Sequence, residues 1–162
     1  PTTAGRQNIL VSLGGTSRAD IAKPIRQTIQ TLTQLGHRVT AVGTDFGVHE
    51  VEFNQFPLIL SEFDLAISAA GSTTLELLWA GTPLVVIPIA DNQIPIAAHL
   101  TRLGAAVSLD TIMPDFESNL TETTVALICD RDRRTEMAAI GRNLVDGRGA
   151  ERIVDTLIEQ QL

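Results

Sequence analysis

Short apolar runs alternate with helix-like segments along this sequence, and that alternation constrains the fold more than any other feature. The run NILVSL (8–13) is rich in β-favouring residues and ends at a pair of glycines. Behind it, apolar residues recur at helical spacing from Ile21 to Leu35, and Gly36 stands where a glycine commonly ends a helix. RVTAVG (38–43) then predicts a second strand. Strand, helix and strand in this order predict parallel pairing with a right-handed crossover.

The same alternation continues toward the C-terminus. Further strands are predicted at 48–53, 64–69, 83–89 and 105–109, and further helices near 56–62, within 69–81, and near 94–103, 122–129, 133–145 and 150–161. Six strands alternating with helices predict an α/β fold, a doubly wound Rossmann-like three-layer sandwich with a mainly parallel sheet in the order 3-2-1-4-5-6. A chain of 162 residues suits a single domain, spanning 1–162.

Composition excludes several classes of partner. The net charge of −7 disfavours nucleic acid and anionic membrane surfaces. The single cysteine, Cys129, cannot form an intramolecular disulfide, and no histidine or cysteine cluster has zinc-ligand spacing, so a cytoplasmic protein without a metal is expected. No apolar run approaches the roughly 18 residues of a membrane span. A bound phosphate would therefore be held by backbone N–H groups rather than by a basic surface.

The predicted strand order brings two glycine and hydroxyl loops together. Strands one and four are neighbours in that order, and ligands of such sheets bind outside their carboxyl ends. A helix N-terminus offers unpaired N–H groups and a partial positive charge to a phosphate, and glycine lets the ligand approach closely. The candidate diphosphate-binding residues are Gly14, Gly15 and Thr16 in the first loop and Gly71, Ser72 and Thr73 in the second.

Each loop also has a purely structural interpretation. The paired glycines are compatible with a simple strand-to-helix turn. Thr73 and Glu76 have the spacing of a capping box, in which each side chain bonds to the other residue's backbone N–H. If Glu76 instead points into the crevice, its carboxylate is suited to the two hydroxyls of a ribose, and the spacing alone leaves both readings open. Leu75, Leu78 and Trp79 are predicted to face the sheet.

A third loop on the same edge reads IADNQIP. Asp91, Asn92 and Gln93 gather amide and carboxylate groups suited to a polyhydroxylated ligand, although polar loops are common. The three histidines lie outside any pattern typical of a nucleophile or a metal site. A dinucleotide-binding Rossmann domain is disfavoured, because the first loop reads GGTS in place of G-x-G-x-x-G.

Three segments together resemble the nucleotide-sugar-binding C-terminal half of GT-B enzymes. They are ILVSLGGT (9–16), DLAISAAGSTTLELLWAGTPLVVIPIADNQ (64–93) and VDGRGAERIV (145–154). The resemblance is greatest to the UDP-sugar hydrolase of pseudaminic acid biosynthesis and to spore-coat polysaccharide proteins, and more distant to the peptidoglycan-precursor N-acetylglucosaminyl transferase. It implies a UDP-sugar ligand and no metal or other cofactor, with a role in surface polysaccharide or nonulosonic acid biosynthesis.

The resemblance also implies individual roles. The two glycine and hydroxyl loops look like the diphosphate site, Glu76 like the ribose ligand, and Asn92 with Gln93 like contacts to the donor sugar. Two departures stand out, namely the short segment between Gly43 and Asp64, where the base pocket is expected, and the absence of the acceptor-binding half. The chain is therefore expected to bind UDP-sugar and to need an N-terminal half, in the same polypeptide or as a separate subunit, for transfer or hydrolysis. A non-catalytic binding or assembly module of the same fold is the alternative.

Overall fold

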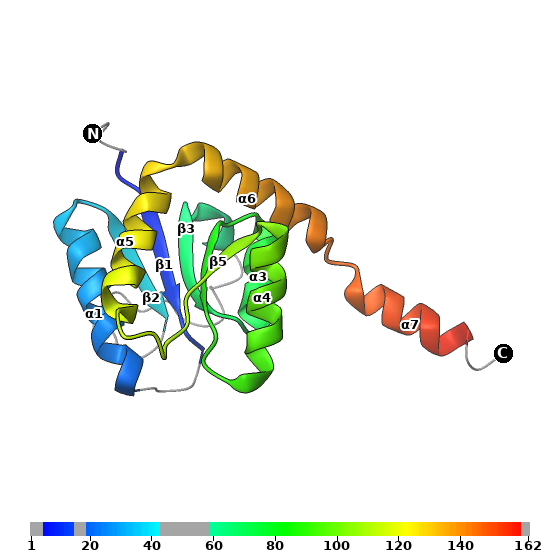
Figure 1. Cartoon of the computed structure of the whole chain (residues 1–162). Helices are drawn as coiled ribbons and strands as arrows, with labels where there is room; N and C mark the ends of the chain where they lie inside the picture. Colours follow the sequence, from blue (N-terminus) through cyan, green and yellow to red (C-terminus); the bar gives the residue numbers. More distant parts are fainter. Residues whose placement is uncertain (1–4, 15–18, 43–58, 160–162) are drawn as a thin grey trace.

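The computed structural model describes residues 5–14, 19–42 and 59–159, and it forms an α/β domain around one parallel sheet (Figure 1). The five described strands lie in the order β2-β1-β3-β4-β5, and every neighbouring pair is parallel. This order matches the predicted one without its third strand, since 48–53 falls outside the described residues. The strands are β1 (Asn8–Ser12), β2 (Arg38–Val42), β3 (Leu65–Ala69), β4 (Leu84–Ile87) and β5 (Ala106–Ser108).

The helices follow the predicted alternation. Helix α5 begins at Phe116, earlier than the predicted 122, because Phe116 and Leu120 are both buried in the core and extend its apolar face. The helices are α1 (Ala19–Gln34), α3 (Ser72–Ala80), α4 (Ile94–Leu103), α5 (Phe116–Cys129), α6 (Arg131–Leu144) and α7 (Gly149–Glu159), with short 3-10 helices η1 (Leu60–Glu62) and η2 (Asp91–Gln93).

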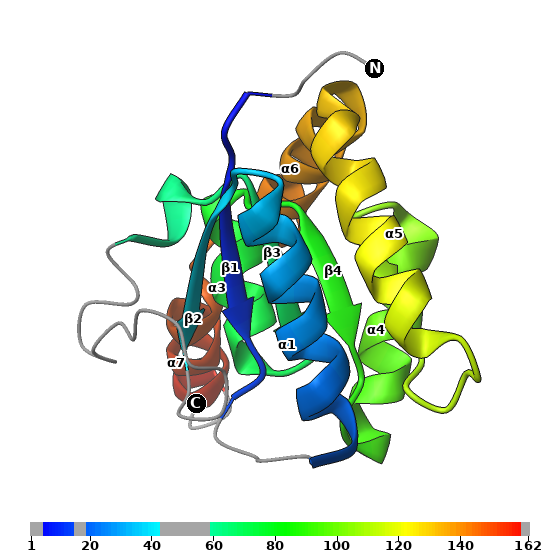
Figure 2. The ribbon, with the colours of Figure 1, turned by 90° about the vertical axis from the view of Figure 1, so that its left-hand side faces the viewer.

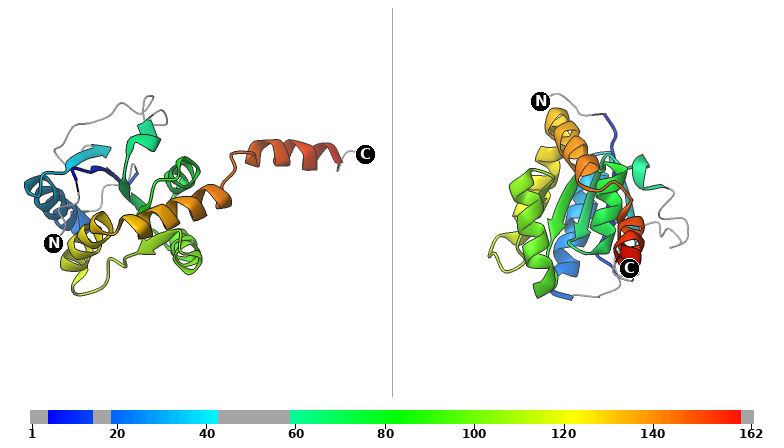
Figure 3. Two further views of the ribbon diagram at one scale, coloured as in Figure 1. Left: turned by 90° about the horizontal axis from the view of Figure 1, so that it is seen from above. Right: turned by 90° about the vertical axis from the view of Figure 1, so that its right-hand side faces the viewer.

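Helices cover both faces of the sheet, as Figures 2 and 3 show. Side chains alternate along β1, so Ile9 and Val11 join the apolar cluster under α1 and α5, whereas Leu10 joins the cluster under α3 and α4. The hydroxyls of Thr28 and Thr121 lie 2.8 Å apart where α1 meets α5. The predicted three-layer sandwich is therefore confirmed.

Helix α3 turns a different face to the sheet from the one predicted. Leu77 and Leu78 are buried, as is Thr74, whereas Leu75 and Trp79 are 52% and 56% exposed. Residues at i, i+3 and i+4 share a helical face, so burial of Thr74 directs Leu77 and Leu78 toward the sheet and turns Leu75 and Trp79 outward. The prediction was right for Leu78 and wrong for the other two side chains.

The last two helices differ in how they pack on the domain. Helix α6 packs against α3 at Gly141, where an added Cβ would lie 3.1 Å from Leu78 Cδ2. Helix α7 projects away from the body of the domain and buries none of its side chains (Figures 1 and 3). Within the described part of the chain, no helix combines the length and apolarity needed to cross a membrane.

Candidate functional site

Three loops meet at the carboxyl edge of the sheet. The register pairs Ser12 with Ser68 and Ala69 with Ile87, so β1, β3 and β4 end side by side. Figure 2 shows the arrowheads of β1 and β4 at the same edge, where α1 begins. The loops that follow these three strands are the ones predicted from the sequence, and the fold brings them together.

The first loop is described only at its start. Gly14 is exposed and adopts a φ of +75°, a left-handed conformation that favours glycine. It follows Leu13, which is buried, so the chain leaves the core at this glycine. Gly15 and Thr16, predicted to complete the first diphosphate loop, lie outside the described residues.

The second loop leads into an uncapped helix. Gly71 is the N-cap residue of α3 in an extended conformation, and no side chain caps the helix. The hydroxyl of Thr74 donates to the carbonyl oxygen of Ala69 over 2.7 Å, closing the turn between strand and helix. The N–H groups of Ser72 and Thr73 have no acceptor among the described residues. A helix start with free donors at a sheet edge is suited to an anion.

The predicted capping box is wrong. Helix α3 begins at Ser72, which makes Thr73 its second residue rather than its cap. The cap position belongs to Gly71, because the hydrogen bond from Thr74 to Ala69 fixes where the helix starts. Glu76 is exposed, and its carboxylate makes no hydrogen bond or ion pair with any described residue. Its carboxylate is therefore available to a ligand, and its role as a ribose ligand stays a prediction.

Glu76 borders an apolar hollow. The hollow has a volume of about 300 Å³ and lies on the outer side of α3. Glu76 is one helical turn from Ser72, so the two side chains share a face of α3. The carboxylate thus lies between the uncapped helix start and apolar surface. The residues that line the hollow are Leu60, Leu75, Glu76, Trp79, Val145 and Gly147.

The third loop is held by its own glutamine. Gln93 accepts a hydrogen bond at Oε1 from the N–H of Ile89 over 3.0 Å, and its own N–H donates to Ala90 over 2.9 Å. Its Nε2 lies 3.7 Å from the position of a Cβ added at Gly71, so the side chain approaches the start of α3. Asp91 and Asn92 are exposed on the same turn. The sequence placed these residues on the right edge, but it gave no sign that Gln93 bonds within its loop.

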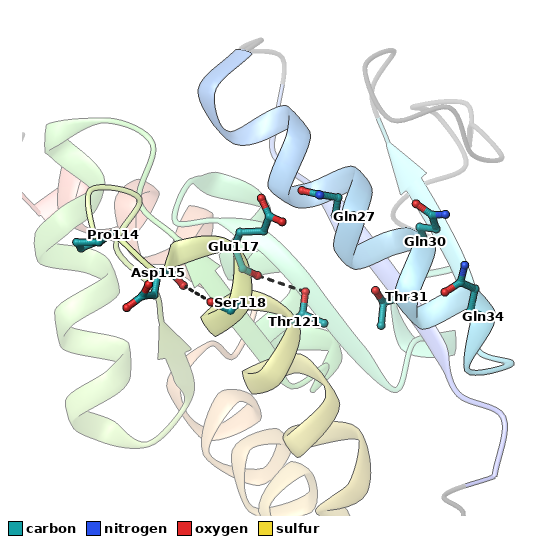
Figure 4. Close-up of a pocket in the computed structure, with 9 residues that line it drawn as sticks. All are labelled: Gln27, Gln30, Thr31, Gln34, Pro114, Asp115, Glu117, Ser118 and Thr121. Atoms are coloured by element: carbon teal, nitrogen blue, oxygen red, sulfur yellow. Dashed lines mark hydrogen bonds between the residues drawn. The ribbon is translucent and has the colours of Figure 1, made fainter.

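The other polar features lie apart from these loops. His37 accepts from the N–H of Gln7 over 3.3 Å at the start of β1, and burial lowers the pKa of its imidazole. Among the described residues, no three His, Cys, Asp or Glu side chains gather as a metal site. A polar hollow of about 540 Å³ lies between α1 and α5 (Figure 4), and none of the predicted site residues lines it.

The order of the parallel strands and the uncapped start of α3 define a Rossmann-like domain. Backbone N–H groups without an acceptor among the described residues lie at the carboxyl edge of its sheet. The chain belongs to the family of the glycosyltransferase family 28 C-terminal domain, whose model matches residues 10–153. This membership confirms the predicted GT-B relationship.

Relatives share both sequence and fold with the chain. It is 30% identical over 174 residues to the UDP-N-acetylglucosamine–N-acetylmuramyl-(pentapeptide) pyrophosphoryl-undecaprenol N-acetylglucosamine transferase of Glaesserella parasuis, covering 96% of this chain and 49% of the relative. The structure of MurG from Acinetobacter baumannii superposes with a TM-score of 0.71 at 21% identity, covering 95% of this chain and 50% of that one. The chain thus spans about half the length of these relatives.

The resemblance was expected to be greatest to the UDP-sugar hydrolase, and the comparisons correct this expectation. The bifunctional pseudaminic acid cytidylyltransferase and UDP-sugar hydrolase of Helicobacter pylori is 39% identical over only 66 residues, which cover 40% of this chain and 13% of the relative. The match to the Glaesserella transferase extends over nearly the whole chain. The transferases, rather than the hydrolase, are therefore the better guide to this domain.

Proposed function

We propose that the chain is the donor-binding half of a glycosyltransferase that uses a UDP-sugar. The observation that carries this proposal is the uncapped start of α3, where the N–H groups of Ser72 and Thr73 lie free beside an unpaired Glu76. Family membership and the transferase relatives support UDP as the nucleotide. UDP-N-acetylglucosamine, named in those relatives, is the first donor to test.

Each loop has a part in the proposed site. Gly14, Gly15 and Thr16 would hold one side of the diphosphate, and Gly71, Ser72 and Thr73 the other. Glu76 would accept from the ribose hydroxyls, and the exposed Asn92 would contact the donor sugar. During transfer the bond between the anomeric carbon and the diphosphate oxygen breaks, and N–H donors aimed at the departing UDP stabilise its developing charge.

Activity would need a second half. The relatives are about twice as long as this chain, so we propose that acceptor binding belongs to a partner domain, in the same polypeptide or in a separate subunit. Exposed apolar side chains on α7 support a surface that another domain covers, since soluble proteins rarely leave such stripes open. These side chains are Ile153, Val154, Leu157 and Ile158, which are 53–63% exposed.

The transferase relatives also favour glycosylation of a peptidoglycan precursor over nonulosonic acid biosynthesis. The acceptor named in the Glaesserella relative is an N-acetylmuramyl-(pentapeptide) pyrophosphoryl-undecaprenol. In the proposed arrangement that acceptor would contact the partner half, and this chain would contribute the donor. Hydrolysis by water has weaker support, because the hydrolase relative covers less than half of this chain.

Calorimetric titration with UDP tests the proposal. Wild-type protein should bind UDP, and Glu76→Gln should weaken binding by about 1–3 kcal/mol, the cost of leaving the ribose hydroxyls without their acceptor. The matched control is Glu122→Gln on the exposed side of α5, which should keep the wild-type affinity. No binding of UDP at millimolar concentration would favour the non-catalytic module, and binding of NAD instead would favour a dinucleotide domain.

A further inference from the structure

The polar hollow between α1 and α5 shares no lining residue with the three loops of the candidate site. Its volume of about 540 Å³ falls within the ordinary range for small-ligand pockets. Six of its lining residues carry a neutral amide or hydroxyl group, namely three glutamines and Thr31 from α1, and Ser118 and Thr121 from α5. Figure 4 shows Gln27 and Thr31 extending from α1 toward α5, where Glu117 and Thr121 lie opposite them. The two helices thus present polar side chains to each other across this hollow.

The amide of Gln27 is unpaired at its buried end. Its Oε1 is buried and accepts no hydrogen bond, and neither end of the amide bonds to a described residue. The hydroxyl groups where the two helices touch are already engaged. Thr121 donates to the carbonyl oxygen of Glu117 over 3.3 Å, which leaves Thr28 as the donor across the 2.8 Å between the two threonine hydroxyls. A buried acceptor without a donor costs free energy, so a ligand that brings a donor to Gln27 would be stabilised there.

Two carboxylates also line the hollow. The side chains of Asp115 and Glu117 make no hydrogen bond or ion pair with any described residue. In the described part of the chain, no lysine or arginine lines the hollow, so a phosphate or another anion would be repelled without a compensating cation. Of the described lining residues, only Pro114 has no polar side chain, so an apolar ligand would leave the other groups unpaired. The chemistry of the hollow therefore requires a ligand that is neutral or cationic and rich in hydrogen-bonding groups.

The hydroxyl groups of a sugar match this set of partners. A sugar hydroxyl can donate to the oxygen of Gln27 or to a carboxylate, and it can accept from the amide N–H groups of Gln30 and Gln34. An ammonium group only donates, so it would leave those amide hydrogens without an acceptor. We propose that this hollow binds a neutral saccharide at a site separate from the carboxyl edge of the sheet. The inference does not depend on the proposed function, because none of the donor-site residues lines the hollow.

Amide NMR titration of the whole chain tests this site. Glucose, N-acetylglucosamine and cellobiose are added in turn with excess UDP present, so that the donor edge is occupied. At least one of these sugars should shift the signals of residues 27–34 and 115–121 and reach saturation below about 100 mM, since hydrogen bonds alone carry the binding.

Two results of this titration would overturn the inference. One is that none of the three sugars produces a saturable shift at 27–34 and 115–121, and this result includes saturation by spermidine alone, which would favour an ammonium ligand. The other is that the shifts are confined to residues 71–76 and 91–93, at the donor edge. If UDP does not bind, the proposed function fails, and the residues that shift still distinguish the two places.

Two substitutions test single contacts in the hollow. Gln27→Leu keeps most of the side-chain volume and removes the amide, so sugar affinity should fall at least about fivefold. The midpoint of urea unfolding should stay equal or rise, because a buried oxygen without a donor is removed. Glu117→Ala should weaken sugar binding to a similar extent, whereas Glu122→Ala, at an exposed position of α5 outside the hollow, should not. Unchanged affinity in either Gln27→Leu or Glu117→Ala would overturn the inference, and a lowered midpoint in Gln27→Leu would contradict the unpaired oxygen on which it rests.

Discussion

The hydroxyl of Thr74 donates to the carbonyl oxygen of Ala69 over 2.7 Å, and this buried bond sets where α3 starts. Thr74→Val keeps the shape of the side chain and removes the donor. We expect the free energy of unfolding to fall by about 1 kcal/mol in urea denaturation, since Ser68 still donates to the same oxygen. Thr33→Val, which removes a part-buried bond to the carbonyl of Ile29 within α1, should have a smaller effect. An equal loss in both variants would argue against a special role for Thr74.

Ser72→Pro tests whether a backbone N–H holds the anion. Proline is tolerated at the first position of a helix, and the extended conformation of Gly71 suits a residue before proline. Stability should therefore change by less than about 0.5 kcal/mol, whereas UDP affinity should fall by about 1–3 kcal/mol because a donor is lost. Ser72→Ala keeps the N–H and serves as the control in the same calorimetric titration. Should both variants bind UDP equally, the N–H of residue 72 is not a ligand.

Helix α6 lies close against α3 at Gly141. A Cβ at this position would lie 3.1 Å from both Leu78 Cδ2 and the carbonyl oxygen of Leu78. Gly141→Ala should therefore lower the free energy of unfolding by about 1–3 kcal/mol, although alanine is the better helix former. A Cβ at Gly149 meets nothing within 4 Å, so Gly149→Ala should leave stability unchanged or raise it by at most about 1 kcal/mol. Chemical denaturation of both variants makes the comparison, and a stabilised Gly141→Ala would contradict the close packing.

His37 predicts a pH dependence of stability. Burial lowers the pKa of its imidazole in the folded protein below the ordinary value of 6.5, so the unfolded chain binds the proton more readily. The stability that neutral His37 contributes to the folded protein is therefore complete above about pH 6.5, and it is lost as the pH falls toward the lowered pKa of the folded state. Protonation also removes the acceptor for the N–H of Gln7. Between about pH 7.5 and about pH 5.5, His37→Asn should show a flatter stability curve than the wild type, and parallel curves would exclude this role.

The sequence predicted the layers of the fold because its signals are local. Gly36 ends α1 with a φ of +91°, as its position after the apolar stripe indicated. The face of α3 could not be predicted the same way, because the helix start depends on a bond between Thr74 and a strand carbonyl rather than on a local cap. The helix cap is Gly71, two residues before the predicted Thr73, and Leu75 and Trp79 lie on the surface rather than against the sheet.

The sequence predicted the position of the site, but not the contacts that its side chains make. The predicted strand order placed the two glycine loops and the third loop, which contains Asp91, Asn92 and Gln93, on one edge of the sheet. The register confirms that β1, β3 and β4 end together at that edge. The contacts of each side chain could not be predicted, because they depend on how the loops pack against one another. Nothing in the spacing of Glu76 distinguished a cap from a free carboxylate, and nothing in the sequence indicated that Gln93 bonds to Ile89.

Helix α7 and the rest of the described chain contribute unequally to cooperative unfolding. Its 11 residues bury no side chain. The denaturant m-value depends on the surface that becomes exposed on unfolding, so α7 should add little to it. A helix this short is marginal in water on its own. Proteolytic cleavage at Arg148 would therefore release α7 and leave the melting transition of the remaining body in place. We therefore expect the sandwich to carry the cooperative transition, and the order of α7 to come from whatever it contacts.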